Sequence, residues 1–314
     1  MIYSVITGKQ DQMNFPKRIP ITGWTKGVKP EVPSVITFDA YNTLYATTLP
    51  VMEQYCLVGQ KYGVIADPKQ LTRNFPYVFK HLKTEHPNYG KYTHISANDW
   101  WQLLIREVFK PIDLPSEMVD EILTRFEGLE AYVVQPDVLE FLEKVKSKHP
   151  DIVLGIISNT DPIMYTLLRN IKLYPFFENH IYLSYDLEVK KPSREIFAHA
   201  LNDIVKKHPK LIDGITIQEL VSKCWHIGDE ELNDMKAAEA VDWNGILIDR
   251  TNKYGYLSES FQNVERSEHH LSIDKIDGNS RKNYRLSMEQ QDIVQISAKT
   301  YVASNFESLK AMLM

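Results

Sequence analysis

The sequence predicts an α/β fold in which helices cover both faces of a parallel β-sheet and a helical domain is inserted near the start. Short, continuously apolar segments recur along the 314-residue chain, as expected of strands buried on both faces. Segments of helical periodicity separate them, and this alternation is typical of a parallel sheet. The stretch between the first two apolar segments holds helical patterns only. Because it is too long for an ordinary connection, it predicts an insertion.

Six segments are expected to form strands, five because they are short and continuously apolar and one near the end of the chain. They cover residues 34–38, 152–158, 180–184, 224–227, 245–248 and 301–303. Helices are expected between or after them, at residues 137–148, 162–170, 193–207 and 305–314. In the first of these helices, Val138, Phe141, Leu142 and Val145 share one face. The core domain is therefore expected to comprise residues 34–48 and 133–314.

Residues 49–132 are expected to form the inserted helical domain. Four helical patterns lie in it, at residues 51–62, 68–83, 97–109 and 116–127. A turn-rich loop is expected at residues 85–90, between the second and third patterns. Trp100 and Trp101 lie in the third pattern, where aromatic side chains pack in a core more often than they contact a substrate.

Two segments do not fit the core pattern. Residues 1–33 carry a mild basic excess, which leaves organelle targeting open, but Pro16 and Pro20 would interrupt the amphipathic helix of a mitochondrial presequence. A disordered or loosely docked N-terminal arm is the favoured interpretation. Residues 254–292 are polar, charged and rich in serine, so they are expected to form a mobile surface insertion within the core domain.

Composition narrows the classes of function. Hydrophobic residues make up 43% and charged residues 25% of the chain, as in ordinary globular proteins. The net charge of -5 gives no support for nucleic-acid binding, which needs a basic surface. No apolar run reaches the roughly twenty residues of a membrane span. Cys56 and Cys224 form neither a disulfide framework nor a zinc motif, so an intracellular location is expected, in the cytoplasm or the mitochondrion.

Four polar segments each follow a predicted strand. Asp39 follows the first strand, Ser158 and Asn159 follow the second, Lys191 follows the third, and Asp229 follows the fourth. Each has an ordinary structural alternative when taken alone, such as a turn, a helix cap or a solvated charge. Together they are expected to meet at one edge of the sheet, where parallel sheets bind their ligands.

The chemistry expected at this edge is phosphate binding with a metal. A carboxylate at a strand end suits a nucleophile, and the hydroxyl of Ser158 with a nearby lysine suits phosphate oxygens. Asp229 and Asp234 supply hard oxygen atoms of the kind that Mg²⁺ binds together with water and substrate phosphate.

In order and context, these four segments resemble the motifs of the haloacid dehalogenase superfamily, over about residues 35–248. The resemblance implies a Rossmann-like core with a helical cap domain at residues 49–132. It implies a hydrolase that uses Mg²⁺ and acts on a small phosphorylated substrate. In that assignment Asp39 is the nucleophile, and Ser158, Asn159 and Lys191 bind phosphate. Asp39, Asp229, the Ala40 carbonyl and Asp234 are the metal ligands.

A closer resemblance is to the third group of haloacid dehalogenase-like domain-containing proteins, which includes fungal proteins linked to mitochondria. It is carried by Pro87-Asn88-Tyr89-Gly90 followed by the Trp100-Trp101 pair. The segment Ser158-Asn159-Thr160-Asp161 is similar to the Ser-Asn-Phe-Asp of that group.

Tyr41 departs from the pattern of the superfamily's phosphatases, which carry an aspartate two residues after the nucleophile as general acid and base. Tyrosine titrates near pH 10, so it donates a proton at neutral pH but is a poor base. A catalytically impaired protein that binds a ligand or partner is therefore an alternative. The order Asp-x-Tyr also occurs in 2-haloacid dehalogenases, but those use an arginine soon after the first motif, and none lies between Asp39 and Arg73.

Overall fold

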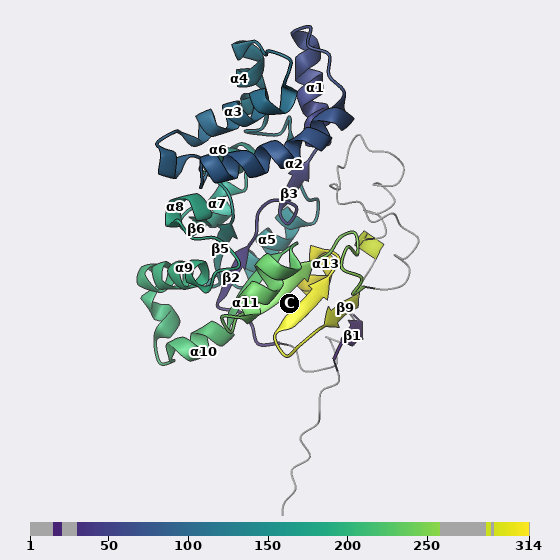
Figure 1. Ribbon diagram of the computed structural model, residues 1–314. Helices are drawn as coiled ribbons and strands as arrows, with labels where there is room; N and C mark the ends of the chain where they lie inside the picture. The colour runs from purple at the N-terminus through teal and green to yellow at the C-terminus, as the bar shows by residue number, and fades with distance from the viewer. Residues whose placement is uncertain (1–14, 21–29, 258–286, 290–291, 314) are drawn as a thin grey trace, which may run out of the picture.

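The computed structural model describes residues 15–20, 30–257, 287–289 and 292–313, and the statements below concern these residues (Figure 1). Their centre is an eight-stranded sheet in the order β1-β9-β10-β8-β7-β2-β5-β6. The six strands from β10 to β6 are parallel, and β9 and β1 extend one edge in antiparallel fashion. The expected α/β fold with a mostly parallel sheet is confirmed.

All six predicted strands are present, each within one residue of its expected bounds. They are β2 (Val35–Phe38), β5 (Val153–Ser158), β6 (Ile181–Leu183), β7 (Cys224–Gly228), β8 (Asn244–Ile248) and β10 (Thr300–Ala303). The four predicted core helices are also present. They are α5 (Val138–Lys148), α6 (Ile163–Asn170), α9 (Arg194–Lys207) and α13 (Phe306–Leu313).

Helices cover both faces of the sheet because successive strand side chains point to opposite sides. Ile36 and Phe38 of β2 belong to a buried cluster with α5, α6 and α13. Val35 of the same strand belongs to the opposite cluster, which includes α9 and two short helices, α10 (Ile217–Ser222) and α11 (Ala237–Glu239). Shorter elements in the connections were not predicted: α7 (Tyr174–Phe177), α8 (Ser184–Leu187), a π-helical turn, η4 (Glu231–Lys236), and a 3₁₀ turn, η3 (Pro209–Ile212).

The helical insertion has a hydrophobic cluster of its own. Its helices are α1 (Val51–Lys61), α2 (Pro68–Glu85), α3 (Ala97–Phe109) and α4 (Ser116–Arg125), with one 3₁₀ turn, η2 (Lys91–Thr93). Figure 1 shows α1–α4 gathered at one end of the molecule. A two-stranded ribbon joins these helices to the core. It pairs β3 (Tyr45–Thr47) with β4 (Tyr132–Val134), and it was not predicted from the sequence. None of the described helices is long and apolar enough to span a membrane.

Two further strands lie where none was predicted. Strand β1 (Lys17–Pro20) falls inside the expected N-terminal arm and pairs with β9 (Asp292–Gln295), at the end of the expected insertion. The start of that insertion also packs on the core, because Leu257 is buried and the Tyr256 hydroxyl donates to Glu231 at 2.6 Å. Residues 17–20 of the expected arm and residues 256–257 at the start of the expected insertion therefore contact the core. Residues 1–14, 21–29, 258–286 and 290–291 lie outside the described part of the chain.

A buried ion pair connects three elements of the core. The guanidinium of Arg250 donates to both oxygens of Asp137, at 3.0 and 2.7 Å. The backbone N–H of Phe306 donates to the same carboxylate at 2.8 Å. Asp137 stands at the start of α5, Arg250 follows β8, and Phe306 begins α13, so the carboxylate joins elements far apart in the sequence.

Replacing Arg250 by methionine is expected to lower the free energy of unfolding by about 3–5 kcal/mol, because Asp137 would remain buried without its counter-charge. Urea unfolding of the purified variant measures this loss. The double variant Arg250→Met with Asp137→Asn is the matched control, since it removes both charges. It is expected to recover part of the loss, and equal losses in both variants would contradict this explanation.

Candidate active site

The four polar segments meet at the carboxyl ends of the central strands, as expected. Strand β2 lies between β5 and β7, and Asp39 follows it directly, with its backbone N–H donating to the Ile227 carbonyl at 2.8 Å. One cavity of about 520 Å³ is lined by all seven residues that the sequence singled out. They are Asp39, Tyr41, Ser158, Asn159, Lys191, Asp229 and Asp234.

Lys191 stands at the centre of the charged groups. Its Nζ lies 2.7 Å from Asp39 Oδ1 and 2.6 Å from Asp234 Oδ1, and the side chain is buried. Asn159 holds this part of the chain, because its Nδ2 donates to the Lys191 carbonyl at 2.9 Å and its Oδ1 accepts from the Lys191 N–H at 2.8 Å. The Asn159 amide thus positions the lysine, a contact that the sequence did not indicate.

Three carboxylates form the acidic part of the site. One oxygen from each of Asp39, Asp229 and Asp234 lies within 4.8 Å of the other two, and among the described residues this is the one such acidic group. Thr43 Oγ1 donates to Asp229 Oδ1 at 3.2 Å, and the Glu230 N–H donates to Asp234 Oδ2 at 2.9 Å. Oxygen atoms at this spacing suit Mg²⁺.

The three carboxylates outnumber the one lysine that contacts them. Burial raises the pKa of Asp39 to about 6, although Lys191 opposes the change. Burial and the neighbouring carboxylate of Asp39 raise the pKa of Asp229 well above its usual range. Asp234 differs: burial opposes its ionisation, but Lys191 and His226 hold its pKa below the ordinary value. One lysine faces three carboxylates, so the acidic group is compatible with a bound cation.

His226 and Thr37 lie behind Asp234 on strands β7 and β2, and neither was predicted from the sequence. The Nε2 of His226 lies 3.2 Å from Asp234 Oδ1, and its Nδ1 lies 2.8 Å from Thr37 Oγ1. Burial lowers the pKa of His226 to about 4, so the ring is neutral and its Nε2–H donates to the ionised Asp234. A histidine inside the apolar strand 224–227 was the signal available in the sequence.

Gly228 allows Asp234 to approach the end of β7. A Cβ atom at this position would lie 2.2 Å from the Asp234 carboxyl carbon, which is closer than any real contact. The glycine of the Gly228-Asp229 pair is therefore required by the carboxylate that lies against it.

Tyr41 lies in the wall of the same cavity, fixed by other aromatic side chains. Its ring centroid is 6.1 Å from that of Tyr45 and 6.3 Å from that of Tyr132. Burial, and next the nearby Tyr132, raise its pKa above the ordinary tyrosine value. The phenol is therefore protonated at neutral pH, as expected, and is a poor base.

The helical insertion touches the core at the second polar segment. Trp101 Nε1 donates to Asp161 Oδ2 at 2.9 Å, and the Tyr89 hydroxyl donates to the Asn159 carbonyl at 3.3 Å. Both residues line the cavity. Trp100 is fully buried and donates to the His86 carbonyl at 3.0 Å. The tryptophan pair therefore divides: Trp100 packs in the insertion, and Trp101 faces the cavity.

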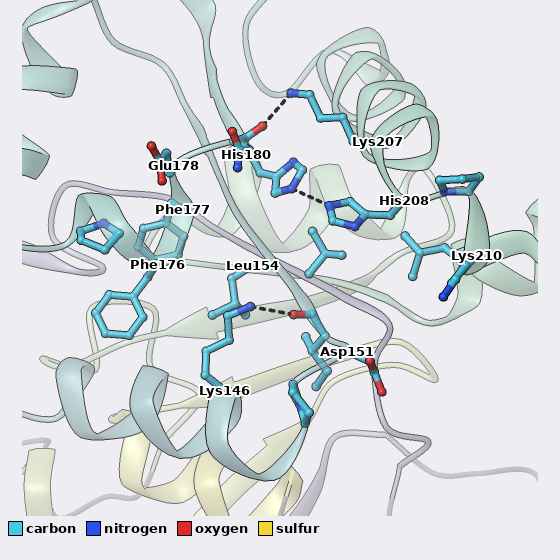
Figure 2. A pocket seen from close by; sticks show the side chains of 17 residues that line it. Lys146, Asp151, Leu154, Phe176, Phe177, Glu178, His180, Lys207, His208 and Lys210 are labelled. Atoms are coloured by element: carbon cyan, nitrogen blue, oxygen red, sulfur yellow. Dashed lines mark hydrogen bonds between the residues drawn. The ribbon is translucent and has the colours of Figure 1, made fainter.

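A second cavity, of about 730 Å³, lies at the opposite edge of the sheet, near the start of β5 and β6 (Figure 2). His180 and His208 face each other in it, with their Nε2 atoms 2.9 Å apart. Lys207 reaches into the same region but already donates to the Asn179 carbonyl at 2.7 Å. The acidic group of the described residues lies in the other cavity, which makes the smaller one the candidate active site.

Comparison with known proteins identifies the family. A family model described as haloacid dehalogenase-like hydrolase matches residues 33–242, about two thirds of the chain. The chain belongs to the haloacid dehalogenase-like hydrolase family. The family resemblance seen in its four motifs is thereby confirmed, and the matched range spans all of them.

Relatives agree with the closer resemblance as well. An uncharacterized protein of Saccharomyces cerevisiae is 54% identical over 300 residues, which cover 96% of this chain and 99% of that protein. The haloacid dehalogenase-like hydrolase domain-containing protein 3 of Danio rerio is 26% identical over 220 residues, covering 68% of this chain and 84% of its own length. Both the fungal and the third-group likeness are therefore found.

A solved structure supports the fold. A defluorinating L-2-haloacid dehalogenase matches with a TM-score of 0.56 and covers 91% of this chain and 99% of its own. Sequence identity is 14%, so the likeness concerns the haloacid dehalogenase fold alone.

Neutralising Asp39 is expected to stabilise this haloacid dehalogenase-like protein when no metal is present. The pKa of Asp39 is raised from 3.8 to about 6, so between these pH values the folded protein keeps a proton that the unfolded chain has released. The free energy of unfolding therefore falls as pH rises through this window and remains lower above it. Asp39→Asn removes the charge and is expected to raise the free energy of unfolding at pH 7.5 by about 1–3 kcal/mol.

Urea unfolding in EDTA at pH 4 and pH 7.5 measures this gain. Asp113→Asn, at an exposed position outside the cavity, is the matched control and is expected to change little. A gain from Asp39→Asn that is as large at pH 4 as at pH 7.5 would contradict the electrostatic origin.

Proposed function

We propose that this chain is a Mg²⁺-dependent hydrolase of small phosphate monoesters that uses Asp39 as its nucleophile. The observation that carries the proposal is the meeting of Asp39, Lys191 and the acidic group at one end of a cavity. Members of the haloacid dehalogenase superfamily typically use Mg²⁺, and the acidic group offers carboxylate oxygens of the kind that this ion binds.

Existing hydrogen bonds distinguish the proposed metal ligands from Asp234. Asp39 and Asp229, with the Ala40 carbonyl, would hold Mg²⁺. Asp234 belongs to the same acidic group, but both of its oxygens already accept hydrogen bonds, from Lys191, His226 and the Glu230 N–H. Its proposed role is to orient Lys191. The bound metal would supply positive charge that neutralises the phosphate and the carboxylates together.

The first chemical step is attack of an Asp39 carboxylate oxygen on phosphorus. A bond forms between that oxygen and phosphorus, the bond from phosphorus to the leaving oxygen breaks, and the leaving oxygen takes a proton from solvent water. Lys191 stabilises charge on the carboxylate and on the phosphate, and Ser158 contributes a hydroxyl to the phosphate oxygens. Such electrostatic support is effective because the groups are buried and fixed in place.

The second step exposes the difficulty at Tyr41. Water attacks the aspartyl phosphate, phosphate leaves, and the proton of the water must reach a base. A protonated phenol supplies none, so the phosphoryl-enzyme is expected to hydrolyse slowly. The same observation favours a second candidate, a protein impaired in turnover that acts by binding a ligand or partner.

The deciding experiment measures phosphate release from acetyl phosphate and phenyl phosphate with Mg²⁺ and with EDTA. Release that requires Mg²⁺ supports the proposal. Silence in the wild type together with activity in Tyr41→Asp supports the impaired protein. Chloride release from 2-chloropropionate without metal would overturn both in favour of a dehalogenase. That reaction is disfavoured, because the described cavity lining contains no arginine to receive the halide.

A further inference from the structure

The cavity has two unlike ends. Its polar end is the site at the carboxyl ends of the strands. The other end lies under the helical insertion and is walled by aromatic side chains from that insertion, namely Phe75, Phe79, Tyr89, Trp101 and Phe126. Aromatic walls with a few polar groups at one end are typical of pockets that bind small organic ligands.

Two of these aromatic residues are fixed by their polar atoms. Trp101 Nε1 donates to Asp161, and the Tyr89 hydroxyl donates to the Asn159 carbonyl, so both polar groups are engaged by the core. The rings of Tyr89 and Trp101 lie 6.1 Å apart, and those of Phe79 and Trp101 lie 6.5 Å apart. A ligand would therefore contact ring surfaces that are already held in place, so little conformational entropy of these side chains is lost on binding.

The charges of the lining exclude a second anionic group on the ligand. Lys191 is the one cationic side chain in the described lining, and two carboxylates already pair with it. The Nζ of Lys83 lies 4.4 Å from the Phe79 ring centroid, but Lys83 is not part of the lining. Within the lining, the charged side chain bonded to the aromatic wall is Asp161, whose oxygens accept from the Ile163 N–H at 2.9 Å and from Trp101. A carboxylate or second phosphate placed there would be buried without a partner, which is strongly unfavourable.

We propose that the phosphate monoester bound here carries an uncharged, bulky and aromatic alcohol portion, which lies against the ring surfaces of the insertion. The proposal rests on the proposed function, because the phosphate end is assigned by that function. It separates this chain's substrate from sugar phosphates, bisphosphates and phosphorylated acids.

The test measures binding of phosphonates, which cannot be hydrolysed at the P–C bond by this chemistry, to the full chain with Mg²⁺ by isothermal titration calorimetry. Benzylphosphonate is expected to bind at least about tenfold more tightly than methylphosphonate, because its ring is removed from water. Phosphonoacetate, which adds a carboxylate instead, is expected to bind no better than methylphosphonate. Equal affinities for the benzyl and methyl compounds would overturn the proposal.

A matched pair of variants locates the effect on the wall. Phe79→Leu deletes a ring that lines the cavity, and Tyr77→Leu deletes an exposed ring on the same helix, α2, outside the lining. Phe79→Leu is expected to weaken benzylphosphonate binding by about three- to tenfold, the range of aromatic contacts, and to leave methylphosphonate binding unchanged. Tyr77→Leu is expected to leave both unchanged. If Phe79→Leu keeps the full preference for benzylphosphonate over methylphosphonate, the placement of the ligand's ring against Phe79 is contradicted.

Two further outcomes separate this inference from the proposed function. Selective binding of benzylphosphonate without phosphate release from benzyl phosphate would support the pocket and contradict the hydrolase. Mg²⁺-dependent phosphate release from acetyl phosphate without any benzyl preference would support the hydrolase and overturn the pocket. Tightest binding of a phosphonate analogue of phosphocholine would show that the rings hold a cation and would overturn the uncharged class.

Discussion

Replacing Asp39 by asparagine is expected to abolish Mg²⁺-dependent phosphate release, with a fall of at least about a thousandfold, as for other covalent nucleophiles. The amide cannot attack phosphorus, and it removes one of the carboxylates proposed to hold the metal. Phosphate release from acetyl phosphate under saturating Mg²⁺ measures the effect.

The stability of Asp39→Asn shows whether lost activity comes from unfolding. Because Asp39→Asn is expected to stabilise the metal-free protein, lost activity together with a raised urea midpoint points to chemistry and not to a damaged fold. Asp113→Asn is expected to keep full activity. Undiminished phosphate release from Asp39→Asn would contradict the nucleophile assignment.

Replacing Tyr41 by aspartate is expected to raise the turnover rate by about a hundredfold or more, within the range of general acid–base catalysis. Aspartate would supply the base that the second step lacks, since Tyr41 is held protonated by its burial. In the wild type, rapid-quench kinetics with phenyl phosphate are expected to show a burst of phenol followed by slow phosphate release. Tyr41→Asp is expected to remove the burst.

Tyr41→Asn is the matched control for this gain. It has nearly the volume of aspartate and disturbs the contacts with Tyr45 and Tyr132 to the same degree, but it provides no base. An acceleration as large in Tyr41→Asn as in Tyr41→Asp would assign the gain to space in the cavity and contradict general-base catalysis.

Much of the fold could be predicted because its signals are local. A strand buried on both faces is typically continuously apolar, so five of the six parallel strands could be predicted from this pattern. Strands β1 and β9, at one side of the sheet, were missed, because they are short and lie in segments of loop-like composition. Their pairing joins residues more than 270 positions apart, and no local pattern encodes it.

Some residues of the candidate site could likewise be predicted from the sequence, and others could not. Asp39, Lys191 and Asp229 were predictable because each follows a strand, and parallel strands bring their carboxyl ends to one edge. His226, which lies beneath Asp234, gave only a weak signal, since one histidine in an apolar strand usually has a structural role. The hydrogen bonds between the Asn159 side chain and the Lys191 backbone could not be predicted, because they depend on how the loops after β5 and β6 meet in space.

By itself, then, the sequence determined the parallel strands, the longer helices, the family and the groups that meet at the sheet edge, because periodicity and motif order are properties of the chain. The tertiary structure decided which polar atoms those groups engage and how burial alters their charge. It also decided that Trp100 packs inside the insertion while Trp101 lines the cavity. These neighbours in sequence differ because adjacent helical positions point about 100° apart, and only packing fixes which of them faces the ligand.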